Sequence, residues 1–190
     1  HETKIGNSRV QLTFDNETAQ LTGLAFNGRQ VLAGGEGFRY DNHRWIENDR
    51  FGNTDPGLEP KGEIKVGEKD GLTIVQTRRA GSLCSTEIDY TLSPQGIVDV
   101  EARFTPHTDQ LRRAGLVCFL DSALSQVDYY ALGPWENSND RKDGVMAGRY
   151  QTTVPQMAEA YVKPQSTGNR EELRELTLAD HTGIGIRLSL

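Results

Sequence analysis

Alternation of apolar and polar side chains with a period of two residues is the dominant pattern of this 190-residue chain. Between residues 84 and 92, apolar or small side chains alternate with polar ones without interruption, and segments 10–14 and 98–104 repeat the pattern. Successive side chains of a β-strand point to opposite faces, so these segments are predicted to be strands with one buried face. Further strands are expected at 21–26, 29–33, 72–78, 114–120, 126–131 and 184–190.

The connections between these segments favour antiparallel pairing. Asn27-Gly28 is a strong signal for a two-residue hairpin, because both central residues of a type I′ turn need a positive φ. No stretch longer than about ten residues has the spacing of an amphipathic helix. The sequence therefore predicts an all-β fold, a single large antiparallel β-sandwich domain over residues 1–190.

Charge and hydropathy exclude two classes of partner. The chain has 27 acidic and 21 basic residues, a net charge of -6, and no cluster of Lys and Arg. Binding to a nucleic-acid backbone needs such a cluster, and a membrane-spanning helix needs roughly 18 consecutive apolar residues, which the chain also lacks. We therefore expect neither nucleic acid nor membrane as a partner.

Residues that could carry chemistry are scattered. Cys84 and Cys118 do not form a C-x-x-C pair, and both are expected to be free cysteines on apolar strand faces. The histidines lack metal-ligand spacing, so no metal site is predicted, and no G-x-S-x-G or dinucleotide-binding motif is present. These four histidines are His1, His43, His107 and His181.

Two long interruptions separate the predicted strands, at 41–62 and 133–144. Each combines a tryptophan with carboxylates, an asparagine and an arginine. Such a set can bind a sugar, because an aromatic ring packs against C–H groups and planar polar groups bond hydroxyls. In the alternative interpretation, each tryptophan fills an end of the sandwich and the polar groups hold the loop backbone. The candidate sugar-contacting residues are Trp45, Glu47, Asn48 and Asp49 in the first loop and Trp135, Glu136 and Asn137 in the second.

Three segments resemble a known family. Residues 132–141, Leu-Gly-Pro-Trp-Glu-Asn-Ser-Asn-Asp-Arg, resemble the G-P-x-E-N-x-x-D-R signature of the C-terminal "small chain" (domain 5-like) domain of bacterial glycoside hydrolase family 2 β-galactosidases. Residues 161–170, with Arg174 beyond them, resemble the Y-V-x-P-x-x-x-G-x-R segment of that domain. Residues 47–49 resemble the end of its R-A-P-x-D-N-D loop. The order and spacing of the three segments agree with the family.

This resemblance implies a fold and a role. The fold would be the galactose-mutarotase-like supersandwich, incomplete at its C-terminus because the chain stops at Leu190 inside a predicted strand. The chain would be a fragment of a multidomain retaining β-galactosidase whose two catalytic glutamates lie in a separate barrel domain. No catalytic residue is therefore assigned here. The expected role is that of a non-catalytic domain that buttresses and borders the active site.

The resemblance also implies partners and surroundings. The partners would be the remaining domains of the parent enzyme and, through it, a β-galactoside substrate, and the parent would be a homo-oligomer. We expect no cofactor in this chain, and any divalent cation of the parent would bind outside it. The compartment would be the cytoplasm or periplasm of a bacterium.

One departure and one structural hypothesis follow from the motifs. The family's R-A-P is His43-Arg44-Trp45 here, so the first loop keeps only its acidic end. Asp140 and Arg141 are expected to form a structural knot with Glu136 and Asn137, and Arg174 is expected to hold the 161–170 segment in a similar way.

Two other functions stay open at this level. A galactose-binding module would require Trp45 or Trp135 to be exposed to solvent. A free-standing aldose 1-epimerase would need a histidine and a glutamate as acid and base, and none of the histidines lies in a recognisable epimerase motif.

Overall fold

The computed structural model of this chain describes residues 1–35, 37–43, 57–162 and 167–190. These residues form two compact units, unit 1 (His1–Leu120) and unit 2 (Asp121–Leu190). Every strand pair in both units is antiparallel within the described ranges. The helical content of the described residues is one 3-10 turn, and no helix among them is long and apolar enough to cross a membrane.

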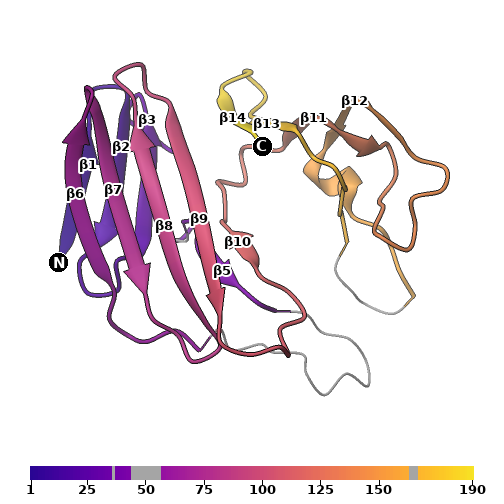
Figure 1. Cartoon of the computed structure of the whole chain (residues 1–190). Coiled ribbons are helices and arrows are strands. Elements are labelled where there is room, and N and C mark those ends of the chain that lie inside the picture. The colour runs from indigo at the N-terminus through magenta and orange to yellow at the C-terminus, as the bar shows by residue number, and fades with distance from the viewer. Residues whose placement is uncertain (36, 44–56, 163–166) are drawn as a thin grey trace. The chain divides into compact units, whose positions relative to one another are not determined.

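Unit 1 contains two four-stranded sheets and a two-stranded sheet (Figure 1). The first sheet has the order β1-β2-β3-β4, and the second has the order β6-β7-β8-β9. The strands of the first are β1 (Glu2–Gly6), β2 (Val10–Asp15), β3 (Leu21–Phe26) and β4 (Arg29–Gln30). Those of the second are β6 (Glu63–Lys69), β7 (Leu72–Arg79), β8 (Cys84–Leu92) and β9 (Val98–Pro106). The two-stranded sheet pairs β5 (Arg39–Asp41) with β10 (Gly115–Val117).

The two larger sheets of unit 1 pack face to face through their alternating apolar side chains. The ring of Phe14 on β2 meets the ring of Tyr90 on β8 edge-on, with 5.3 Å between centroids, and both residues are buried. Burying the apolar face of each sheet against the other is the main source of stability of a β-sandwich. Unit 1 is thus an antiparallel sandwich.

Several predicted elements are confirmed in unit 1. Every second residue of β8 is buried, from Cys84 to Leu92, as the alternation predicted. Asn27 and Gly28 have φ values of 49° and 79°, so the expected hairpin joins β3 and β4. The strand expected at 29–33 is shorter, because only Arg29 and Gln30 pair with β3 and Leu32 bridges Leu120 instead.

Unit 2 contains one sheet with the order β12-β11-β13-β14. One of its faces buries Val127, Tyr129 and Ala131 against half-buried side chains that include Tyr150 and Met157. Met157 belongs to the 3-10 turn η1 (Val154–Met157), which follows β12 directly. The strands are β11 (Gln126–Gly133), β12 (Met146–Thr153), β13 (Glu175–Ala179) and β14 (Gly185–Ser189).

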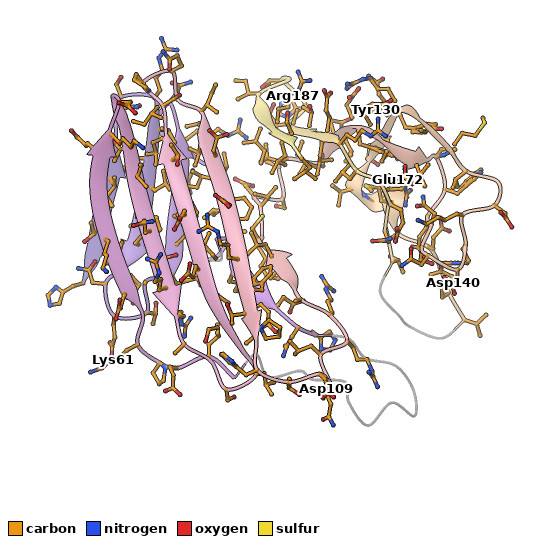
Figure 2. All side chains as sticks on the ribbon, in the orientation of Figure 1. Lys61, Asp109, Tyr130, Asp140, Glu172 and Arg187 are labelled. Carbon is orange, nitrogen blue, oxygen red and sulfur yellow. The ribbon has the colours of Figure 1, made fainter. Side chains whose placement is uncertain are left out.

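The opposite face of the unit 2 sheet is polar. Arg149 on β12 pairs with Asp128 on β11 and with Glu175 on β13, and Arg187 on β14 pairs with the same Glu175 at 2.8 Å. Figure 2 labels Arg187 and Tyr130 on this sheet. Alternation of buried apolar and solvated ionic side chains makes this a sheet with one buried face.

The predicted all-β, antiparallel sandwich class is confirmed. The finer expectations, namely the supersandwich, its incomplete C-terminus and a single domain over 1–190, stay predictions. The sequence analysis missed β1, β5, β6, β12 and β13, and β6 shows why. Its residues are almost all exposed at a sheet edge, so no buried face imposes alternation on them.

Candidate functional site

The signature segment 132–141 begins at the end of β11, where the backbone passes close to two tyrosines. A Cβ on Gly133 would lie 2.8 Å from the ring of Tyr150 and 3.0 Å from the hydroxyl of Tyr129. Only glycine fits this approach without displacing a neighbour. The Tyr129 hydroxyl donates a hydrogen bond of 3.0 Å to the carbonyl of Pro134, which fixes the start of the loop.

Asn137 is fully buried, and its side chain bonds only backbone groups. Its Nδ2 donates to the carbonyls of Leu132 (3.0 Å) and Trp135 (2.9 Å), and its Oδ1 accepts from the amide of Glu171 (2.8 Å). A buried asparagine side chain must satisfy both its donors and its acceptor, and these three bonds do so.

The backbone of Asn137 is held as firmly as its side chain. Its amide donates to the carbonyl of Asn169 (3.1 Å), and its carbonyl accepts from the Asn169 side chain (2.7 Å). Asn137 therefore joins the loop after β11 to the segment near residue 170, more than thirty positions later.

Glu136 makes a second connection between the same two segments. Its carboxylate accepts hydrogen bonds from the Tyr161 hydroxyl, from the amide of Gly168 and from Nη2 of Arg141 at 2.7 Å. The Glu136 side chain is only 5% exposed, whereas that of Arg141 is 49% exposed. Burial alone would raise the pKa of this carboxyl, but the hydrogen bonds from Tyr161, Gly168 and Arg141 outweigh it and hold the pKa below its ordinary value.

These contacts form a closed unit that we call the polar knot. Gly168 contributes its amide from a φ of +88°, a backbone conformation that favours glycine, and Arg141 also donates to the Tyr161 hydroxyl at 2.9 Å. The knot consists of Glu136, Asn137, Arg141, Tyr161, Gly168, Asn169 and Glu171.

The chemistry available to the knot is limited by its own contacts. A general acid for glycoside hydrolysis needs a carboxyl with a raised pKa, and the pKa of Glu136 is lowered instead. A nucleophile needs an accessible oxygen, and both oxygens of Glu136 already bond the protein. The geometry favours a structural role.

The other two residues expected in the structural motif lie at different places. Asp140 is exposed in the loop between β11 and β12 (Figure 2), where its carboxylate accepts from the Ser138 hydroxyl. The Arg174 guanidinium lies 5.3 Å from the ring centroid of Tyr130 on β11. The described side chains that hold segment 161–170 are those of the knot, together with Arg170 itself, which bonds Tyr129.

The structure describes three of the seven predicted sugar-contacting residues, and these three differ in burial. Trp45, Glu47, Asn48 and Asp49 lie outside the described residues. In the second loop, Glu136 and Asn137 point into the knot, while the Trp135 side chain is 68% exposed. The Trp135 ring therefore lies outside the buried cluster of unit 2, whereas the side chain of Asn137 holds the backbone of the loop.

Cysteine and histidine do not build a second site in the described residues. Cys84 and Cys118 are free, as expected, and burial raises the pKa of both thiols. The ring of His107 bonds the Ser85 hydroxyl at 2.8 Å on an exposed edge. Within the described residues, no three or more His, Cys, Asp or Glu side chains come together in a group that could hold a metal ion.

What sequence reasoning missed in the knot are chiefly its backbone donors. The amides of Gly168 and Glu171 hold Glu136 and Asn137, and a sequence does not show which amide a side chain will reach. Tyr161 and Gly168 match fixed positions of the second motif, and they were the available signal.

The fold and the knot define a β-sandwich protein in which hydrogen bonds of Glu136 and Asn137 fix the loop after β11. Comparison with known proteins gives the family: residues 6–190 match the family model described as "Beta galactosidase small chain". The chain belongs to this family.

The relatives of this chain are named β-galactosidase. The chain is 25% identical over 186 residues to a β-galactosidase of Priestia megaterium, covering 90% of this chain and 18% of that protein. It is 33% identical over 153 residues to a β-galactosidase of Lactobacillus delbrueckii subsp. bulgaricus, covering 78% of this chain and 14% of that one. The chain thus spans less than a fifth of the length of these relatives.

Proposed function

We propose that this chain is a non-catalytic domain of a retaining β-galactosidase, which buttresses and borders an active site formed elsewhere. The observation that carries the proposal is the polar knot. In the signature motif that relates the chain to β-galactosidases, the carboxylate of Glu136 and the side-chain amide of Asn137 are both buried and both bond groups of the chain itself.

Two further points support this role. Retaining hydrolysis needs two carboxyl groups about 5–5.5 Å apart, one of them a proton donor with a raised pKa. Glu136, the carboxylate of the signature, has a lowered pKa and is closed off from solvent. The relatives are also much longer than the segment they share with this chain, which leaves room in them for a catalytic domain.

The test is an assay of the isolated chain with o-nitrophenyl β-D-galactoside and, by NMR, with galactose anomers. We expect neither hydrolysis nor faster anomer exchange than in buffer. Hydrolysis that is abolished by Glu136→Gln would contradict the proposal, because it would make Glu136 a catalytic residue.

The buttressing part of the proposal needs a second measurement. A β-galactosidase of this family from which the small-chain segment has been deleted would be mixed with this chain or with its Asn137→Ala variant. We expect the intact chain to restore more activity than the variant, because without the hydrogen bonds of Asn137 the loop after β11 is less ordered. Equal restoration by the two proteins would contradict a supporting role for the knot.

A further inference from the structure

Beside the polar knot lies a hollow that the knot does not use, the Trp135 hollow. It has a volume of about 300 Å³ and is lined by residues of β11, β12, η1 and the segments that follow. That volume is at the lower end of the roughly 300–1,000 Å³ range of small-molecule sites. The lining residues used in the argument are Trp135, Tyr150, Gln156, Glu159 and Arg170.

Aromatic side chains line one part of the hollow. The Trp135 side chain is 68% exposed, and the rings of Tyr129 and Tyr150 lie 5.5 Å apart within the lining. An exposed indole is unfavourable in water unless something covers it, and its flat face suits the C–H face of a pyranose ring.

Polar groups from three segments converge on the same space. Arg170 is fixed in place, because its Nε donates to the Tyr129 hydroxyl (3.2 Å) and its Nη1 donates to the carbonyl of Asn169 (3.1 Å). Its guanidinium carbon also lies 5.7 Å from the Tyr129 ring centroid. Among the described contacts, these leave Nη2 of Arg170 for a ligand.

Gln156 and Glu159 complete the polar side. The Gln156 Oε1 accepts from the hydroxyls of Thr152 (3.4 Å) and Thr153 (3.1 Å), which orients the amide and leaves its NH₂ group as a donor. Glu159 is half-buried and lines the hollow, and its carboxylate is an acceptor for a hydroxyl. One cation and one anion line the hollow, so its formal charge is zero and a neutral ligand fits better than an ionic one.

We infer that the Trp135 hollow binds a neutral hexopyranoside, with the sugar ring on Trp135 and its hydroxyls bonded by Arg170, Gln156 and Glu159. This site is independent of the proposed structural role, since none of these four side chains belongs to the polar knot. A ligand of about twelve non-hydrogen atoms in such an open site should bind with a Kd on the order of 1–10 mM.

The experiment is an NMR titration of the ¹⁵N-labelled chain with methyl β-D-galactopyranoside and methyl β-D-glucopyranoside. The Trp135 indole N–H is the reporter, and a Trp45→Phe background makes it the single indole signal, since the chain has two tryptophans. We expect a saturable shift of this signal with at least one of the two sugars, and the preferred sugar defines the specificity.

Three variants test the assignment. Trp135→Ala, followed through backbone amides near residue 156, should raise the Kd by more than tenfold, and Glu159→Gln should raise it by about fivefold. Met146→Ala is the matched control, because Met146 is 74% exposed on the same sheet and does not line the hollow. The Kd of this variant should stay within about twofold of the Kd of the Trp45→Phe chain.

Three results would overturn the inference. The first is the absence of a saturable Trp135 shift up to about 100 mM sugar, well above the expected Kd. The second is an unchanged response in Trp135→Ala. The third is an equal response to glycerol, which would be a solvent effect. None of the side chains changed here belongs to the buried cluster of unit 2, so dispersed spectra of the variants will separate lost binding from lost folding.

Discussion

Replacement of Asn137 by alanine is the most informative perturbation of the polar knot. The substitution removes the two donor bonds to the carbonyls of Leu132 and Trp135 and the bond accepted from the Glu171 amide. Asn137 is fully buried, so the lost side-chain atoms leave unpaired backbone groups around a small void.

The magnitude follows from the bond count. Three intramolecular hydrogen bonds at about 1 kcal/mol each give a loss of about 3 kcal/mol in the free energy of unfolding. With a urea dependence of about 2 kcal/mol per molar, the midpoint of unfolding should fall by about 1.5 M.

The assay is urea unfolding followed by the fluorescence of Trp135 in the Trp45→Phe background. Trp135 lies two residues from Asn137, so its emission reports the unit that carries the knot even if unit 1 unfolds separately. The matched control is Asn139→Ala, an exposed asparagine of the same loop, whose effect should stay within about 0.5 kcal/mol.

A second variant separates hydrogen bonding from packing. Asn137→Asp keeps the shape of the side chain but directs a carboxylate oxygen at two carbonyl oxygens, so it should destabilise at least as much as alanine. If Asn137→Ala and Asn139→Ala shift the midpoint equally, or if Asn137→Asp is harmless, the reasoning about the knot is refuted.

Three further predictions concern the neighbours of Asn137. Arg141→Ala should lower the urea midpoint by less than Asn137→Ala, because Arg141 is half-exposed and Glu136 keeps its bonds from Tyr161 and Gly168; a larger loss would contradict this. Glu136→Gln should lower the free energy of unfolding at pH 7. Because the lowered pKa of Glu136 stabilises the fold only while the carboxylate is ionised, this loss should become smaller as the pH falls below 4.5. Unfolding curves at pH 3.5–7 measure the loss, and a loss that does not change with pH would contradict the prediction. Gly168→Ala should cost about 1–2 kcal/mol through its φ of +88°, whereas Gly67→Ala, in open space outside that backbone region, should be nearly neutral; thermal unfolding of the pair decides.

The part of the fold that the sequence predicts well is the part in which one face is buried. In β8, burial on one face and solvent on the other impose the alternation that made the strand visible. β6 and β12 lie at sheet edges. Almost all of β6 is exposed and no residue of β12 is fully buried, so burial constrains their side chains less than those of β8. Their pairing comes from neighbouring strands.

The candidate site was predictable to a similar degree. The motif predicted a common knot of Glu136, Asn137, Asp140 and Arg141; the structure brings three of them together, while Asp140 bonds Ser138 in the exposed loop. Glu136 and Asn137, however, also accept bonds from the amides of Gly168 and Glu171. These amides follow β12 in the chain and precede β13, which pairs with β11. The exposure of Trp135 depends on the same backbone path, and sequence alone could not provide it.

Amide hydrogen exchange at Glu171 tests the central claim most directly. In the intact chain the Glu171 amide donates to the buried Oδ1 of Asn137, and the account predicts that it exchanges slowly, as does the amide of Gly168, which donates to Glu136. In the Asn137→Ala variant, exchange of the Glu171 amide should accelerate by at least tenfold. In the Asn139→Ala control variant, the same Glu171 amide should stay protected. Rapid exchange at Glu171 in the intact chain, or protection that survives Asn137→Ala, would contradict the claim that the polar knot joins the loop after β11 to the segment near residue 170.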